Sequence, residues 1–154
     1  MRRNDLKVID LNKIVEIFDN SPTLRLGLHD SPYPYVVPLS YGYDVSGDRI
    51  ELYIHGALEG KKHDLISKNN FVCVEVDYFD GYGLTELSAT ANYSSIIAYG
   101  RIFLIVDEKE RLDAISSICR HCGLDDLEVN SDLFKKVGMY KIVLDEVSAK
   151  SNMF

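Results

Sequence analysis

Two adjacent lysines, Lys61 and Lys62, stand where the sequence predicts that a strand ends and a helix begins, within the segment His55–Leu65. Free backbone N–H groups and the helix dipole already make a helix N-terminus partly positive, so each lysine there costs roughly a few tenths of a kcal/mol. A phosphate between the lysines would remove that cost, because N–H donors, a glycine and basic side chains together bind anions. The segment therefore predicts a phosphorylated ligand. The alternative is that both lysines extend into water.

The composition of the chain favours a small ligand over a nucleic acid. The chain has 154 residues, which suits a single domain over residues 1–154 with an ordinary hydrophobic core. Its formal net charge is −7, whereas nucleic-acid binding requires a net basic face. A local basic pair in an acidic chain indicates a small anion instead.

The sequence predicts a cytoplasmic protein that does not interact with a membrane. The first residues form a polar mixture without the apolar region of a signal peptide, and no later stretch approaches the roughly 18 apolar residues of a membrane span. Three cysteines, Cys73, Cys119 and Cys122, make an odd number without a regular framework. Such usage is typical of a reducing compartment.

The motif Cys119-Arg-His-Cys122 has the spacing of zinc and redox sites, but its context favours neither. With His121 and Cys73 it could form a zinc site, yet structural zinc sites normally show two ligand pairs and only one is present. A thioredoxin-like motif opens a helix after a strand, whereas this one closes a helix before Gly123. We interpret these cysteines as helix-packing residues and predict no metal site.

Hydrophobic patterns predict six antiparallel strands with short helices at the margins. The predicted strands cover residues 24–28, 35–43, 49–55, 71–77, 93–106 and 140–147. The predicted helices cover residues 11–18, 60–68 and 107–123, with a further short piece at 133–137; residues 78–92 are expected to form a long loop and residues 148–154 a tail. This order favours a mainly β barrel.

The first two strands should pair as a hairpin, because residues 29–32 have turn chemistry. Pro38 lies inside the second of these strands and has no N–H to donate to a ladder. It therefore belongs at a sheet edge or a bulge, where unpaired backbone becomes available to a ligand.

Several segments resemble one known family in their residues, order and spacing, across nearly the whole chain. They are Arg2-Arg3, Arg25-Leu-Gly-Leu28, Tyr35-Val-Val-Pro-Leu-Ser-Tyr-Gly-Tyr43, Tyr53-Ile-His-Gly-Ala57, Gly60-Lys-Lys-His-Asp-Leu65 and Tyr93-Ser-Ser-Ile-Ile-Ala-Tyr-Gly-Arg101. Together they resemble the nitroimidazole-resistance branch of the pyridoxamine-5′-phosphate-oxidase-like flavin split barrels. The resemblance implies a six-stranded antiparallel split β-barrel that forms a homodimer, with FMN in clefts at the interface so that both subunits touch each flavin.

The resemblance also implies roles for individual residues. Lys61 and Lys62 would hold the FMN phosphate, and His55 would be the catalytic residue near the flavin. The other implied cofactor contacts are Val37, Pro38, Leu39 and Ser40 along the isoalloxazine, Gly56 beside His55, and Ser94 and Ser95. A strand histidine at a barrel rim can equally be a hydrogen-bonded surface group, so both interpretations of His55 stay open. The family often has arginine at the position of Lys61 and an aliphatic residue at that of His63.

The function that this resemblance implies is an FMN-dependent oxidoreductase. NAD(P)H would drive the reduction of nitroaromatic or related small acceptors, and His55 could supply a proton. The flavin carries the chemistry of such an enzyme, which agrees with the lack of a catalytic triad in the sequence. The alternative is a non-catalytic flavin- or haem-binding module, with His55, His63 or His121 on the haem. Oxidation of pyridoxamine phosphate is less favoured, because the Arg-x-His substrate signature of that enzyme is absent from residues 140–154.

Overall fold

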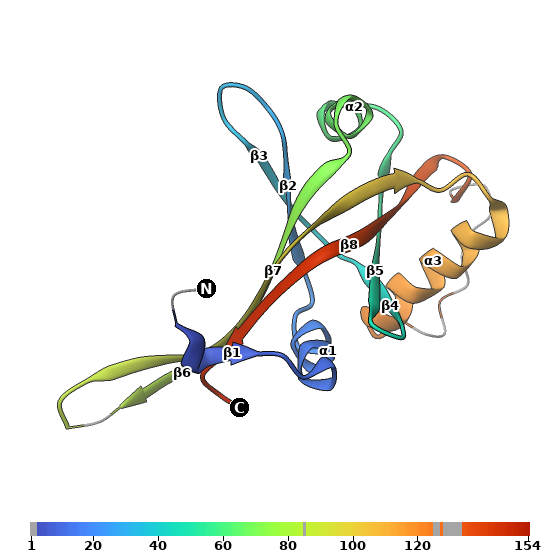
Figure 1. The fold of residues 1–154 in the computed structure, drawn as a ribbon. Coiled ribbons are helices and arrows are strands. Elements are labelled where there is room, and N and C mark those ends of the chain that lie inside the picture. Colours follow the sequence, from blue (N-terminus) through green and yellow to red (C-terminus); the bar gives the residue numbers. More distant parts are fainter. Residues whose placement is uncertain (1–2, 85, 125–126, 128–133) are drawn as a thin grey trace.

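The computed structural model describes residues 3–84, 86–124, 127 and 134–154, and within these ranges it shows one curved antiparallel sheet with helices around it (Figure 1). The strands are β1 (Lys7–Val8), β2 (Leu24–Leu28), β3 (Tyr35–Leu39), β4 (Gly42–Ser46), β5 (Arg49–Ala57), β6 (Phe71–Leu84), β7 (Ala89–Leu104) and β8 (Val137–Ser151). The helices are α1 (Leu11–Asp19), α2 (Lys61–Lys68) and α3 (Glu108–His121), after the short 3-10 helix η1 (Asn4–Leu6). The predicted mainly β class and split-barrel architecture are confirmed.

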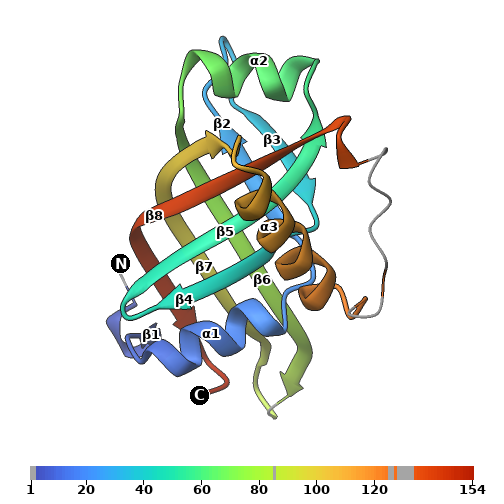
Figure 2. The same ribbon diagram turned by 90° about the vertical axis from the view of Figure 1, so that its right-hand side faces the viewer.

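The order of the strands explains why the barrel is split. The sheet runs β3-β2-β6-β7-β8-β5-β4, with β1 added to β8. Its two ends, β3 and β4, follow each other in the chain, but no ladder joins them in the part of the chain that the structure describes. The sheet curves into a barrel, and the short segment between β3 and β4 connects its two edge strands (Figure 2).

The prediction of one strand over residues 35–43 is wrong, because the chain leaves one sheet edge at Ser40 and joins the other at Gly42. The Tyr41 side chain between them is fully buried, and its hydroxyl donates to the Phe18 carbonyl at 3.0 Å. The predicted hairpin is confirmed, since β2 pairs with β3 from Leu24 opposite Leu39 to Leu28 opposite Tyr35. Pro38 lies on the edge strand β3, as expected.

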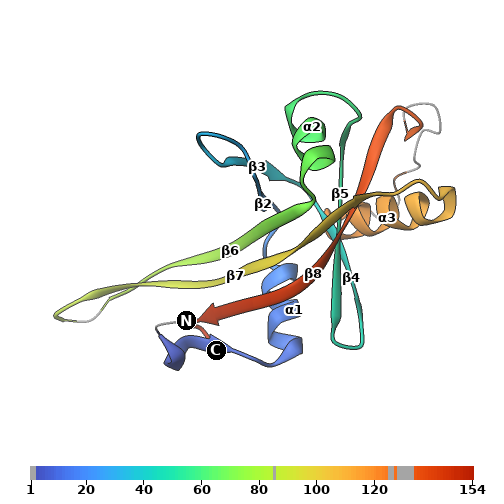
Figure 3. The ribbon, with the colours of Figure 1, turned by 45° about the horizontal axis from the view of Figure 1, so that its top comes forward.

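The long loop predicted for residues 78–92 is also wrong. Both β6 and β7 continue through most of this segment as a two-stranded hairpin that extends away from the body of the molecule (Figure 3). A shift of register between Phe79 and Tyr82, with Gly81 at φ 77°, interrupts the alternation that would otherwise predict strands. With β1 and the division of residues 35–43, the described residues form a sheet of eight strands where the sequence predicts six.

The predictions for the C-terminal part of the chain are also partly wrong. Residues 148–151 belong to β8, where they pair with Ser94–Ile97 of β7, so only the last three residues form a tail. Of the short helix predicted over residues 133–137, residue 133 lies outside the described residues, Phe134 is helical, Lys135 and Lys136 form a turn, and Val137 already begins β8.

The core lies inside the curved sheet and is closed at its two ends by α1 and α2 (Figures 1 and 2). Helix α1 contributes the buried Ile17 and Phe18, and α2 contributes Leu65 and Ile66. Helix α3 packs outside the barrel against β4 and β5. Among the described residues, no helix is long and apolar enough to cross a membrane. The fold therefore places the start of α2, with its two lysines, at the end of the barrel that α2 closes.

Candidate anion-binding site at the start of helix α2

The start of helix α2 has no side-chain cap from the described residues, in contrast to α1 and α3. The Asp10 carboxylate caps α1 and the Asp107 carboxylate caps α3, each by accepting from a backbone N–H in the first turn. Gly60 occupies the N-cap of α2 at φ 92°, a conformation that favours glycine, and among the described residues no side chain caps the helix there. The first backbone N–H groups of α2 are therefore available to an anion.

Lys61 at this helix start is already paired with a carboxylate. Its Nζ lies 2.7 Å from Asp30 Oδ2, and 5.2 Å from the centre of the Tyr35 ring. The hydrogen bond from Lys61 lowers the pKa of Asp30 below its ordinary value, and the Ser31 N–H lowers it further. Lys61 thus ties α2 to the β2–β3 hairpin, and its positive charge is partly offset.

Lys62 differs from its neighbour. Its Nζ donates to the His55 carbonyl oxygen at 3.2 Å, and among the described residues no carboxylate lies within 4.0 Å of it. The side chain is half-buried, and this burial lowers the pKa of Lys62. A partly desolvated ammonium without a counter-ion gains from any anion that binds beside it.

His55 lies next to Lys62, near the end of β5, and is exposed overall. Partial burial lowers the pKa of His55 below its ordinary value of about 6.5, and the positive charge of Lys62 lowers it further. The imidazole is therefore neutral at pH 7. A neutral imidazole can donate or accept a hydrogen bond, but it does not hold a spare proton for an acceptor.

We expect Lys62→Ala to raise the pKa of His55, because the substitution removes a positive charge beside the ring. A pH titration of the His55 ring signals by NMR measures this shift. The folded state disfavours the charged imidazole, so His55 lowers stability as the pH falls below about 6.5, and this acid-induced loss should be smaller in the variant. Lys68→Ala, at the far end of α2, is the control. A His55 pKa that stays constant or falls in Lys62→Ala would show that the charge of Lys62 does not act on the His55 ring.

Two further contacts fix α2 and were not predicted from the sequence. His63 Nδ1 lies 2.8 Å from the hydroxyl of Tyr140, a fully buried side chain of β8. Asp30 contacts Lys61 from the turn after β2. The predicted turn at residues 29–32 gives no indication that Asp30 faces a helix 30 residues later.

The four predicted residues on and after β3 do not share one surface. Val37 and Leu39 are half-buried and pack against the core, whereas Pro38 and Ser40 are exposed. Only the latter two side chains are therefore open to a ligand from outside the barrel.

Ser94 and Ser95 lie far from the lysines within one chain. They pair with Tyr78 and Asp77 in the middle of β6, whereas α2 is followed directly by the first residue of β6, Phe71. Six or seven residues at about 3.3 Å each separate the two positions by roughly 20 Å along the strand. One chain thus brings together His55, Gly56, Lys61 and Lys62, but not the two serines.

The cysteine motif at the end of α3 takes part in packing. The His121 ring lies 4.3 Å from the centre of the Tyr41 ring, and its Nε2 is 3.1 Å from the Ser21 carbonyl oxygen. Cys119 is buried, whereas Cys122 is exposed. Within the ranges that the structure describes, no three His, Cys, Asp or Glu side chains lie together as a metal site would require.

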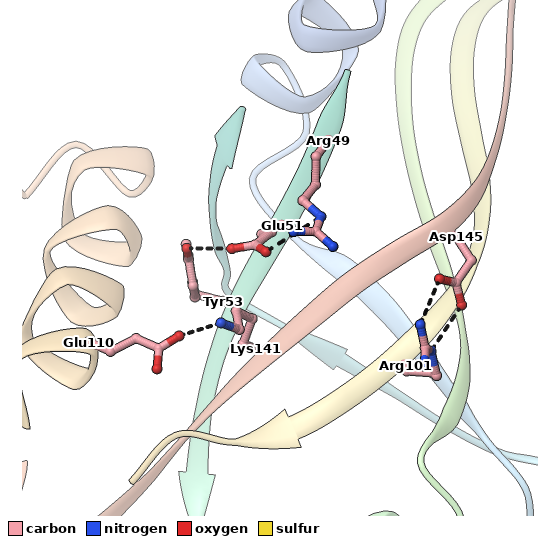
Figure 4. A network of polar contacts seen from close by, with 7 residues as sticks. All are labelled: Arg49, Glu51, Tyr53, Arg101, Glu110, Lys141 and Asp145. Atoms are coloured by element: carbon pink, nitrogen blue, oxygen red, sulfur yellow. Dashed lines mark hydrogen bonds and ion pairs between the residues drawn. The ribbon is translucent and has the colours of Figure 1, made fainter. Parts of the chain in front are cut away.

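A second cluster of polar side chains lies on the outside of the barrel, and its charged groups are paired with one another (Figure 4). Lys141 of β8 forms an ion pair with Glu110 of α3, and Arg101 of β7 pairs with Asp145 at 3.3 Å. The Tyr53 hydroxyl donates to Glu51, which also lies 4.0 Å from Arg49. These contacts tie α3 and the strands together, so we assign the cluster a structural role.

A groove beside Asp30 was also not predicted from the sequence. It has a volume of about 650 Å³ and follows the outer face of the sheet. Its lining is mostly apolar and includes Gly27, Pro34, Val36, Phe71, Cys73 and Tyr99. Because Asp30 belongs both to this groove and to the Lys61 ion pair, the groove begins where the anion site ends. A ligand with an anionic group and an apolar body fits such a combination.

Solved structures of other proteins share this fold. A candidate 5-nitroimidazole antibiotic resistance protein from Bacteroides thetaiotaomicron is 26% identical, with a TM-score of 0.81 over 94% of this chain and 86% of its own. The flavocytochrome Anf3 from Azotobacter vinelandii is 21% identical, with a TM-score of 0.79 over 100% of this chain and 72% of its own. An FAD- and haem-binding protein from Mycobacterium smegmatis is 18% identical, with a TM-score of 0.76 over 96% of this chain and 74% of its own.

No curated protein matches the sequence. The sequence profile described as pyridoxamine 5′-phosphate oxidase matches residues 10–151, which is almost the whole chain. This match agrees with the resemblance of the sequence motifs and with the split-barrel neighbours. The chain therefore belongs to the pyridoxamine 5′-phosphate oxidase family.

Proposed function

We propose that this chain binds FMN and acts as a reductase that passes electrons from NAD(P)H to nitroaromatic or related small acceptors. The observation that carries the proposal is the half-buried Lys62 ammonium at the start of α2, where the described residues provide neither a carboxylate beside it nor a side-chain cap for the helix. The family match and the 26% identical candidate nitroimidazole-resistance protein support the choice of ligand and reaction. Lys61, Lys62 and the first N–H groups of α2 would hold the phosphate.

The bound flavin would supply the hydride and electron transfer, and the protein would bind, orient and shield it. Lys62 supplies a fixed positive charge for the phosphate, and Lys61 supplies a second one that it shares with Asp30. The neutral His55 would donate or accept a hydrogen bond beside the cofactor. The proton that accompanies reduction of the acceptor would then come from solvent, directly or through the His55 ring.

The activity is tested by loading the protein with FMN and following NADH or NADPH oxidation with a nitroimidazole, a quinone or free flavin as acceptor. Oxidation that depends on both bound FMN and the acceptor is the expected result. FMN-loaded protein that oxidises neither nucleotide with any acceptor would overturn the reductase and leave a flavin-binding module. A Soret band in the purified protein would instead favour haem.

We further propose that the functional unit is a homodimer in which each flavin contacts both subunits. The separation of roughly 20 Å along β6 between Phe71, next to α2, and the positions opposite the two serines supports this proposal. A flavin at α2 could then meet the partly exposed Ser95 only from a second copy, whereas Ser94 is buried. The exposed apolar side chains Val36, Phe71 and Tyr99 on the outer face of the sheet support it too.

Two defective variants should complement each other if the site is shared. We expect neither Lys61→Ala/Lys62→Ala nor Ser95→Tyr to bind FMN well alone, because each spoils both sites of its own dimer. Random mixing of the two gives about one half heterodimers, each with one intact site of two, so co-expression should restore about one quarter of the wild-type FMN content. Flavin absorbance per chain measures this recovery. Chains that associate but recover no FMN would contradict the shared site.

A further inference from the structure

Gly56 and Lys62 form a contact that distinguishes Lys62 from an ordinary surface lysine. The Lys62 side chain lies across β5 at Gly56, so that a Cβ added to Gly56 would lie within 3.0 Å of both Nζ and Cε of Lys62. Apart from the chain neighbours of Gly56, no other atom of the described residues lies within 4 Å of that position. A methyl group at position 56 would therefore take up space that the Lys62 ammonium now fills, and apart from the chain neighbours it would meet no other described atom.

The position of the ammonium is defined on its other side by the backbone. Lys62 Nζ donates to the carbonyl oxygen of His55, the residue just before Gly56, at 3.2 Å. Lysine side chains usually lose much rotamer freedom when they are fixed by a ligand. Here the missing side chain of Gly56 and the His55 carbonyl hold the charge in place before any ligand arrives, which lowers the entropic cost of binding.

We propose that Gly56 is a positioning residue for phosphate binding: its missing side chain lets Lys62 lie across β5 with a fixed ammonium at the start of α2. The ligand class is a phosphate monoester, and the inference rests on the proposed binding of FMN. Gly56 acts through Lys62 and need not touch the cofactor. This role differs from the direct cofactor contact that the sequence resemblance implies for Gly56.

The test compares FMN with riboflavin, which has the same ring system but no phosphate. We expect Gly56→Ala to raise the Kd for FMN about tenfold and to leave the Kd for riboflavin unchanged. In a Lys62→Ala background, Gly56→Ala should have no further effect on FMN binding, because the group through which it acts is gone. Quenching of flavin fluorescence measures all four chains of this double-mutant cycle.

Gly83→Ala is the matched control, since Gly83 is also a strand glycine and an added Cβ would make only ordinary contacts of 3.5 Å or more. Equal losses for FMN and riboflavin, or a loss that persists in the Lys62→Ala background, would overturn the role of Gly56. An unfolded Gly56→Ala chain would overturn it too, because the Cβ would then clash with more than a flexible side chain. Wild-type protein that binds neither flavin would instead overturn the proposed function, and the phosphate role of Lys62 with it.

Discussion

Lys62→Ala is expected to weaken FMN binding about 50-fold, whereas Lys61→Ala should weaken it only a few-fold. A charge-assisted hydrogen bond is worth about 1.5–3 kcal/mol, which corresponds to roughly 10- to 150-fold in Kd. Lys62 should show an effect within this range, because it is half-buried and has no carboxylate beside it among the described residues. Lys61 is exposed and shares its charge with Asp30. A solvated, already paired charge contributes about 0.2–1 kcal/mol.

Isothermal titration of each variant with FMN measures this difference, and riboflavin again separates the phosphate from the ring. Lys68→Ala is the charge-matched control, because it removes one positive charge from the opposite end of the same helix. Asp30→Asn extends the test, since it frees Lys61 and should strengthen FMN binding a few-fold. Equal losses for Lys61→Ala and Lys62→Ala would show that the two lysines act as one clamp. That result would contradict the distinction drawn from their contacts.

The helices and the first hairpin could be predicted from the sequence because their signals are local. Helices α1 and α3 begin after capping aspartates at positions 10 and 107, and their apolar residues recur with helical spacing. The break near Tyr41 could not be predicted, because residues 35–43 alternate as a strand does. The chain turns there because the Tyr41 ring enters the core under α1, through a contact with Phe18 that lies far away in the sequence.

The candidate site, too, could be predicted only where its signals lie in neighbouring residues. Lys61 and Lys62 could be identified because the clash of two positive charges with a helix start is visible in neighbouring residues. Their different roles could not, since these depend on Asp30 in one hairpin and on Gly56 in another strand. Likewise, the distance of Ser94 from α2 became apparent only from the register of β6 and β7, which pairs Ser94 with Tyr78, seven residues beyond Phe71.

A large loss of stability is expected for Gly42→Ala, at the point where the split barrel resumes after Tyr41. A Cβ on Gly42 would lie within 3.0 Å of three backbone atoms of α3, at Ser117 and Ile118. Backbone cannot move aside as a side chain does, so the helix itself must shift away from β4. This shift would also strain the hydrogen bond from Ser117 Oγ to the Tyr43 carbonyl, now 3.1 Å. Overpacking of this kind costs about 3 kcal/mol of unfolding free energy.

Urea unfolding followed by circular dichroism measures this loss, with Gly27→Ala as the matched strand glycine. An added Cβ on Gly27 would lie 3.4 Å from the Cys73 carbonyl oxygen, which is tolerable, and should cost less than about 1 kcal/mol. Equal stability of the two variants would mean that α3 does not press on β4 as closely as the contacts at Gly42 indicate.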